Sequence, residues 1–527
     1  MEFLQKFNEI VKCYAEGSRL TDKQQNAELR ELYYALSYEE QYIKLTDIMN
    51  CIKINTDAAL YLLTYLLHVL NDGRIIDFIL SLMESGAVDA LTVLNVIYQT
   101  GVFAFSSTDG IQGKEQFRHI NGLYINQIKR LTDSIEPSKL EYIPVNRRNK
   151  GNIIIVTRSL LGEKHAPTMM LCNLYNYLEK AGYNVIVLVN YMGRIQQDKY
   201  FWIYDAAIDN NLVEDTQKLQ ADHFGLCLNI CNIAFTSQLF YQELNMAVDY
   251  VRAINPEFII DVGGQNIIAD VCSRFTTVCS FPCVGTPVHS AAQVVVRRFH
   301  CEGEAEIIYN SYLTQNQKVY ELMIANELTS VSNMAGTNAV TSGKSNRFIL
   351  LIVGNRLDRE ITDEFLDMLN GILEGEPEVY VKVIGECNEL RDRIRISDNS
   401  DRYIFMGYAE NLQEAMAEGD LFVNPPRTGG GTGATLALKN RTPIVTLGNC
   451  DVALRGEGFV CESLDRYPEI IKKYIHDAEF MKMQQEYCEQ QDKLLNSVDS
   501  IGNMKKFCEE LRNYIVAEEE KNGTYSV

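Results

Sequence analysis

From residue 152 onward, short runs of apolar, mostly β-branched residues alternate with segments of helical periodicity. The first run covers residues 153–156, and a polar loop, an apolar helical face over residues 170–178, Gly182 and a second run at 185–189 follow it. Continuous apolar runs are typical of strands that are buried on both faces of a parallel sheet. A strand, a helix and a strand in this order predict a right-handed βαβ crossover. We therefore expect an α/β fold.

The same alternation returns after a connector. Residues 329–346 are small and polar, which is the composition of a flexible linker. Beyond it, strands are predicted at residues 348–353, 379–384, 403–406, 421–423 and 444–447. Helical segments lie between these strands. The pattern thus predicts two Rossmann-like domains, an N-terminal one over residues 151–330 and a C-terminal one over residues 346–480.

The two ends of the chain have a different character. Over residues 1–135 the apolar residues recur at helical spacing, as in Leu60, Leu63 and Leu67, and we expect an all-α domain of bundled or stacked helices. The polar stretch 133–151 contains two prolines and a basic cluster, which indicates a linker. Residues 481–527 are charged and helical and are expected to pack back on the body of the protein.

Charge and cysteine usage narrow the function classes. The chain has 70 acidic and 49 basic residues, a net charge of -21 that disfavours nucleic acid as a partner. The fourteen cysteines form no Cys-x-x-Cys pair, so we interpret them as free thiols in a reducing compartment and expect no metal site. No stretch reaches the ~18 apolar residues of a membrane span, and no signal peptide is recognisable. We expect a cytoplasmic protein with no transmembrane segment.

The sequence that points most clearly to chemistry follows the predicted strand 421–423. Gly429, Gly430 and Gly431 are consecutive there, and Thr432 opens the next helical segment. Three glycines alone could form a flexible turn. Between the carboxyl end of a strand and the start of a helix, however, glycines let the backbone approach a phosphate, and the helix N-terminus attracts it. We interpret the segment as a diphosphate site.

Several motifs in this half of the chain resemble the donor domain of glycosyltransferases with two facing Rossmann domains, the GT-B fold. A strand that ends in Gly354 and Arg356, a second that ends in Gly385, and a third that ends in Gly407 and Tyr408 precede the glycine-rich turn in the family's order. The pattern is closest to O-GlcNAc-transferase-like enzymes and bacterial protein-glucosylating enzymes. The resemblance implies that a nucleotide sugar binds at Gly354, Arg356, Gly385, Gly407, Tyr408, Gly429, Gly430, Gly431 and Thr432. It implies no metal, and no cofactor besides the donor substrate, which we expect to be a UDP-sugar.

Two positions depart from the family pattern. Many donor domains of this fold carry an acidic residue where Leu436 stands, and the retaining class carries a glutamate where Thr428 stands. Neither residue can supply a carboxylate. Recognition of the ribose must then come from other groups, or this chain has lost donor binding.

The catalytic base is expected from the first Rossmann-like domain. Three candidates lie at predicted strand ends, namely His165, Asp261 and His289. An inverting transfer needs a group that can accept the acceptor's proton, and a histidine or a desolvated aspartate meets this need. We place His165 first, because the loop after the first strand faces the cleft in this fold.

These observations predict a glycosyltransferase that moves a hexose or N-acetylhexosamine from a nucleotide sugar to an acceptor, with a protein as the first hypothesis for the acceptor. Two alternatives stay open. The chain could be a non-catalytic partner or scaffold of a glycosylation complex, or it could be a nucleotide-sugar epimerase. Whether it forms a homo-oligomer is left open as well.

Overall fold

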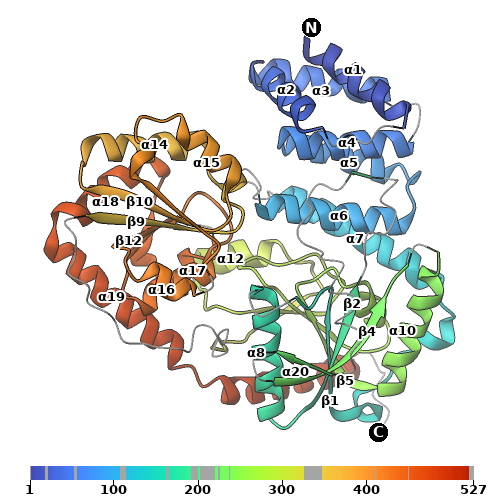
Figure 1. The fold of residues 1–527 in the computed structure, drawn as a ribbon. Coiled ribbons are helices and arrows are strands. Elements are labelled where there is room, and N and C mark those ends of the chain that lie inside the picture. Colours follow the sequence, from blue (N-terminus) through green and yellow to red (C-terminus); the bar gives the residue numbers. More distant parts are fainter. Residues whose placement is uncertain are drawn as a thin grey trace.

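The structure is a computed structural model that contains a helical region followed by two α/β lobes (Figure 1). It describes residues 2–17, 20, 22–52, 56–106, 114–161, 165–191, 200–201, 220–223, 226–236, 238–325, 347–409, 411–448 and 450–521. The predicted fold class, two Rossmann-like domains preceded by helices, is confirmed.

The helical region stacks its helices one layer above another on the first lobe (Figure 1). Its helices are α1 (Glu2–Ala15), α2 (Lys23–Tyr34), α3 (Tyr38–Ile52), α4 (Thr56–Leu70), α5 (Arg74–Glu84), α6 (Ala90–Ser106) and α7 (Lys114–Asp133). Their apolar faces share one core with residues of the first sheet such as Ile154 and Ile259. The helices therefore cover one face of the first lobe and share its core.

The first lobe is built on a sheet of strand order β3-β4-β2-β1-β5-β6-β7-β8. All neighbours pair in parallel except β3 and β4. The strands are β1 (Asn149–Thr157), β2 (Asn184–Tyr191), β3 (Gln220–His223), β4 (Leu226–Ala234), β5 (Pro256–Val262), β6 (Val278–Phe281), β7 (Val294–Arg297) and β8 (Lys318–Glu321). The helices are α8 (Ala166–Lys180), α10 (Phe240–Ile254), α11 (Ile267–Cys272) and α12 (Gly303–Ser311).

The second lobe has a wholly parallel sheet of order β11-β10-β9-β12-β13-β14. Its strands are β9 (Phe348–Val353), β10 (Val379–Ile384), β11 (Tyr403–Gly407), β12 (Leu421–Val423), β13 (Ile444–Leu447) and β14 (Val460–Cys461). Its helices are α13 (Leu357–Glu360), α14 (Asp363–Gly375), α15 (Asn388–Arg395), α16 (Leu412–Met416), α17 (Gly431–Lys439) and α18 (Tyr467–His476). Two apolar cores, one on each face, hold the sheet between these helices.

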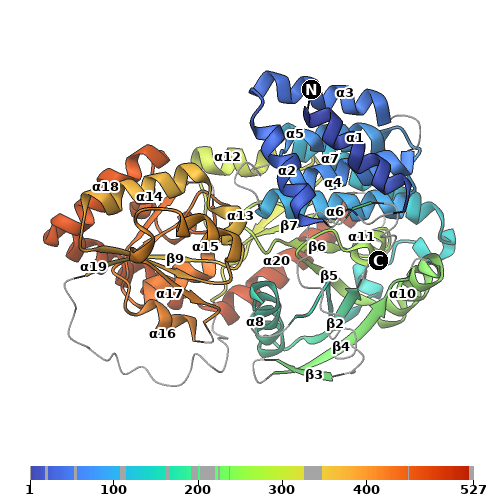
Figure 2. The ribbon, with the colours of Figure 1, turned by 45° about the horizontal axis from the view of Figure 1, so that its top comes forward.

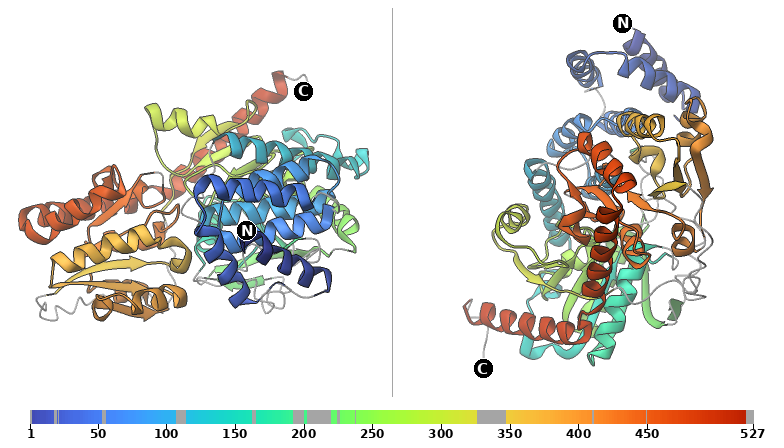
Figure 3. Two further views of the ribbon diagram at one scale, coloured as in Figure 1. Left: turned by 90° about the horizontal axis from the view of Figure 1, so that it is seen from above. Right: turned by 90° about the vertical axis from the view of Figure 1, so that its left-hand side faces the viewer.

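The last two helices connect the lobes. Helix α19 (Ala478–Asn496) packs against α17 of the second lobe, and α20 (Ser500–Lys521) crosses to the first lobe (Figure 3). There α20 lies beside α8 and buries Phe507 and Leu511 in the core of the first lobe.

The stretch 133–151, interpreted as a linker, ends inside the first sheet, because β1 begins at Asn149. Arg148 is only 6% exposed, and its Nη1 atom donates to the carbonyl oxygen of Glu257 at 2.9 Å, so this residue of the basic cluster is fixed to the base of the first sheet. The second predicted linker, 329–346, lies outside the described residues. Among the described helices, none is both long enough and apolar enough to cross a bilayer.

Candidate functional site

The carboxyl edges of the two sheets meet at one junction. Gly285, in the loop after β6, donates its backbone N–H to Asp451 Oδ1, in the loop after β13, at 2.8 Å. A Cβ atom added to Gly285 would lie 3.1 Å from Leu454 Cδ1, so the two loops are in close contact. Ligands of open α/β sheets bind at the carboxyl ends of the strands. The junction is therefore the candidate site.

The glycine-rich turn lies on this junction. Gly431 begins α17, and a Cβ atom added to it would lie 3.1 Å from Asp451 Cβ. Gly430 is the N-cap residue with φ of 101°, a left-handed conformation that favours glycine. Thr432, in the first turn, is exposed. The start of α17, whose first backbone N–H groups have no partner within the helix, thus lies beside the loop that touches the first lobe.

A buried ion-pair network fixes the turn to the end of β9. Arg427 Nη1 donates to Glu360 Oε2 at 2.6 Å, and its other nitrogens donate to Asn424 Oδ1 and the carbonyl oxygen of Val353, each at 2.8 Å. Arg356 Nε donates to Glu360 Oε1 at 3.2 Å. Burial alone would raise the pKa of Glu360, but the Arg427 and Arg356 guanidiniums hold it below its ordinary value. Arg427 is therefore a structural residue, whereas Arg356 is 23% exposed at its side chain.

Three of the predicted glycines come together on the same edge. Gly385 donates its N–H to the carbonyl oxygen of Gly407 at 2.8 Å, and Gly354 donates to the carbonyl oxygen of Ile384 at 3.0 Å. Gly385 has φ of 135°, and a Cβ atom on it would lie 1.7 Å from the carbonyl oxygen of Gly354. Only glycine fits there. Tyr408, directly after β11, is 43% exposed.

Two arginines at the junction were not among the site residues predicted from the sequence. Arg298 follows β7 of the first lobe, and Arg455 ends a short 3-10 helix (Ala453–Arg455) of the second lobe. Their Nε atoms are buried and have no hydrogen-bond partner among the described residues. A Cβ atom on Gly431 would lie 3.2 Å from Arg455 Nη2, which brings this guanidinium to the start of α17. A basic residue at the end of an apolar run, the signal that selected Arg356, would also have selected Arg298.

Asp451 lies among these cations. Its carboxylate interacts electrostatically with Arg298, Arg455 and Arg356. Burial raises the pKa of Asp451, and the hydrogen bond from Gly285 and the three guanidiniums offset this only in part. The junction therefore combines cations from both lobes with the N-terminus of a helix, an arrangement that attracts anions.

His165 belongs to the first lobe and lies at the start of α8. It is the N-cap residue of α8, and its Nδ1 atom is 3.0 Å from Thr168 Oγ1. Burial lowers the pKa of His165 to about 4, so the imidazole is neutral at physiological pH. Arg298 Nη1 lies 3.3 Å from Met170 Sδ, near the start of α8, which links this helix to the cationic cluster.

The other two catalytic candidates are covered by the helical region, which lies over α11, β5 and β6 (Figure 2). The His289 ring stacks on Phe117 of α7 at 4.3 Å, and burial lowers its pKa to about 3. Asp261 is fully buried, and burial raises its pKa well above the ordinary value. Both side chains lie beneath the helical region because α7 packs over this part of the carboxyl edge. Their catalytic role stays a prediction.

Asp261 belongs to a buried polar network. Ser290 Oγ lies 3.3 Å from Asp261 Oδ2 and donates to Asp270 Oδ1 at 2.8 Å. Asp270 Oδ2 accepts a hydrogen bond from the Tyr124 hydroxyl of α7. The Arg158 guanidinium lies 3.7 Å from the centre of the Tyr98 ring of α6. It also interacts electrostatically with the Asp261 carboxylate. This network connects the helical region to the first sheet.

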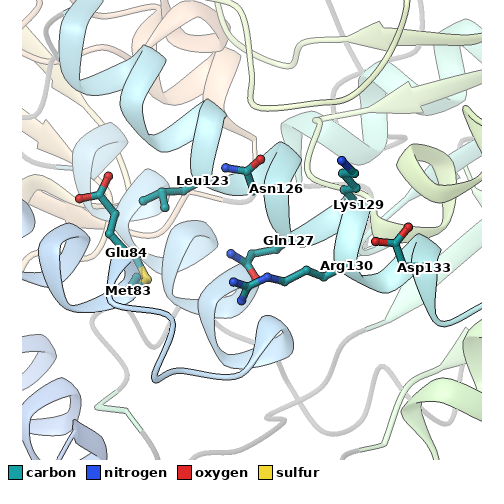
Figure 4. Close-up of a pocket in the computed structure, with 8 residues that line it drawn as sticks. All are labelled: Met83, Glu84, Leu123, Asn126, Gln127, Lys129, Arg130 and Asp133. Carbon is teal, nitrogen blue, oxygen red and sulfur yellow. The ribbon is translucent and has the colours of Figure 1, made fainter.

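A separate cavity of about 440 Å³ lies in the helical region between α5 and α7 (Figure 4). Its lining residues are Met83, Glu84, Leu123, Asn126, Gln127, Lys129, Arg130 and Asp133. Acidic and basic side chains both line it, so it has no strong preference for one charge. None of its lining residues belongs to the junction. Among the described residues, no group of three or more His, Cys, Asp or Glu side chains is arranged to hold a metal ion.

Comparison with solved structures identifies the fold. A mutant of the O-GlcNAc transferase of Thermobaculum terrenum matches over 98% of this chain and 98% of its own, with a TM-score of 0.50 and 13% identity. An N-terminal domain of the Candida albicans trehalose-6-phosphate phosphatase matches 70% of this chain and 97% of its own, at a TM-score of 0.48 and 11% identity. The pneumococcal O-GlcNAc transferase GtfA, in complex with UDP and GlcNAc, matches 69% of this chain and 99% of its own, with a TM-score of 0.44 and 9% identity.

The protein therefore has the GT-B fold, as its sequence motifs predicted. Within that fold, its likeness to the Thermobaculum terrenum enzyme extends over nearly the whole chain, the helical region included. No protein-family model matches the sequence, and no curated protein is similar to it.

Proposed function

We propose that the protein is a glycosyltransferase that binds a nucleotide sugar at the junction of its two lobes and transfers the sugar to an acceptor. One observation carries this proposal: Arg455 lies at the start of α17, and Arg298 of the first lobe and Arg356 of the second interact electrostatically with Asp451 beside it. A sugar transfer releases a nucleoside diphosphate, whose charge must be stabilised as the glycosidic bond breaks. Fixed guanidiniums and a helix N-terminus supply that stabilisation without reorganisation.

The other groups have roles that follow from their positions. Gly354, Gly385 and Gly407 bring three strand ends close together, and the exposed Tyr408 ring beside them is proposed to stack on the base of the nucleotide. His165 is the proposed base that takes the acceptor's proton, because its imidazole is neutral at physiological pH.

The donor is proposed to be a UDP-linked hexose or N-acetylhexosamine. Support for N-acetylglucosamine comes from the Thermobaculum terrenum protein, which is named an O-GlcNAc transferase and matches this chain end to end. The acceptor is proposed to be a protein. The helical region supports this, because it forms a large surface beside the carboxyl edge of the first sheet.

A donor screen tests the proposal directly. The full chain is incubated with a panel of UDP-, GDP- and TDP-sugars, and the released nucleoside diphosphate is measured with and without peptide acceptors. We expect release from one donor class above the rate of an Arg356→Ala variant. Should no donor be hydrolysed and isothermal titration with UDP give no heat, the enzymatic proposal is wrong.

The main alternative is a non-catalytic partner of a glycosylation complex. Leu436 favours it, because this residue is 6% exposed within an apolar core and offers no acceptor to a ribose hydroxyl. Titration with UDP separates the two proposals, since a scaffold binds none. An epimerase would convert one UDP-sugar into its epimer without any acceptor, and chromatography of the sugar product would reveal this.

A further inference from the structure

Asp451 has an unusual place for an acidic residue, since it lies inside the cluster proposed to hold a diphosphate. Its Cβ atom is 3.1 Å from the position that a Cβ atom would take on Gly431, the first residue of α17. Its backbone N–H donates to the carbonyl oxygen of Thr428 at 2.8 Å, so the residue is fixed to the glycine-rich turn. The carboxylate points toward the first lobe, where Gly285 donates to it at 2.8 Å.

The partners of this carboxylate are those that a phosphate oxygen would use. A backbone N–H of one lobe donates to it, and guanidiniums of both lobes interact with it electrostatically. A carboxylate and a diphosphate carry the same sign of charge, and like charges at close range repel strongly in a partly buried site. Both anions therefore cannot occupy the cluster with full hydrogen bonding.

The contact also spans the two lobes. Gly285 and Asp451 belong to different sheets, and Leu454 packs against Gly285 at the same point. When an anion takes over the arginines, the carboxylate loses its favourable surroundings, and the bond to Gly285 weakens with it.

We infer that Asp451 is an anionic latch that occupies the diphosphate position and joins the two lobes until a diphosphate displaces it. This rests on the proposed function of the junction. The displaced carboxylate frees the Gly285 N–H and the guanidiniums of Arg298 and Arg455 for the ligand. The latch thereby couples donor binding to the relative position of the lobes.

Asp451→Asn tests the latch, because asparagine keeps the shape and the oxygen acceptor for Gly285 but lacks the charge. Inorganic pyrophosphate and UDP serve as probes in isothermal titration of the full chain. We expect both to bind the variant roughly 5- to 150-fold more tightly than the wild type, the usual range of a coupling between two sites. Asp465→Asn, which removes an exposed carboxylate from the same lobe, is the matched control and should leave both affinities unchanged.

The distance between the lobes provides a second readout. Spin labels on the two lobes should report a narrow distance distribution in the ligand-free wild type, and a broader one after pyrophosphate binds. If Asp451→Asn does not fold, Asp451→Ser is used, since its hydroxyl can still accept from Gly285. Equal or weaker binding by the variants while the wild type binds UDP would overturn the latch and leave the proposed function standing. Absence of binding to all forms would overturn both.

Discussion

At the scale of single residues, His165 is the group whose protonation can be tested most sharply. Burial lowers its pKa to about 4, so a proton-accepting imidazole is available at every pH well above that value. We predict that kcat/KM is flat from about pH 5 to 8 and falls only as the pH approaches 4. His165→Asn should lower kcat by roughly 10²- to 10⁴-fold. Steady-state rates over this pH range, with His476→Asn as a surface control, check both. An acidic limb near pH 6.5 would exclude His165 as the base.

The cations at the junction give a second residue-scale prediction. Arg455→Met keeps much of the side-chain volume but removes a guanidinium at the start of α17. Because each charge-assisted hydrogen bond contributes about 1.5–3 kcal/mol, the affinity for UDP should fall by roughly 10- to 150-fold. Titration calorimetry measures this, and Arg441→Met, at an exposed position after α17, is the control. Unchanged affinity would mean that the diphosphate does not reach Arg455.

The sequence identified site residues whose position follows from sheet topology, and it missed residues that only long-range folding brings to the site. Gly354, Gly385 and Gly407 end predicted strands, so their approach at one edge follows from the topology of a parallel sheet. Arg455 lies in a short 3-10 helix with no periodicity, and only the folded chain brings it to α17. Burial of His289 likewise depends on α7, which is distant in sequence.

At the scale of elements, the connection between β9 and the glycine-rich turn depends on Glu360. Glu360→Gln leaves the Arg427 guanidinium buried without its counter-charge, which should lower the free energy of unfolding by about 3–5 kcal/mol. Because the pKa of Glu360 is lowered in the folded state, this stabilisation is present above the ordinary glutamate pKa and is lost as the pH falls below it. Urea unfolding at neutral and acidic pH measures the effect. Glu469→Gln removes an exposed ion pair and should cost no more than about 1 kcal/mol.

The elements were predicted best where burial is most complete. The five strands expected in the second lobe agree with β9 to β13 within a residue, because continuous apolar runs mark strands covered on both faces. Strands β3, β4, β7, β8 and β14 were not predicted. Three of them, β3, β8 and β14, lie at sheet edges, and the exposed and half-buried residues of β8 do not form such a run.

At the scale of the whole molecule, the helical region is joined to the first lobe by a polar contact inside an apolar interface. Tyr124 of α7 donates to Asp270 of α11, and both groups are buried. Tyr124→Phe removes the donor and leaves a carboxylate oxygen without it, which should lower the free energy of unfolding by about 1–3 kcal/mol. The exposed Tyr241→Phe serves as the control and should change stability by less than about 0.5 kcal/mol.

The same variant tests whether helices and lobe unfold as one unit. Since they share a continuous core, calorimetry of the wild type should show the helical region melting together with the first sheet. Hydrogen exchange should then rise in α7 and in α11 alike when Tyr124 is replaced, because each loses the partner that holds it. Faster exchange in α7 alone would mean that the helices are an independent domain that merely rests on the lobe. The contact that buries Asp261 and His289 could then open without unfolding the first lobe.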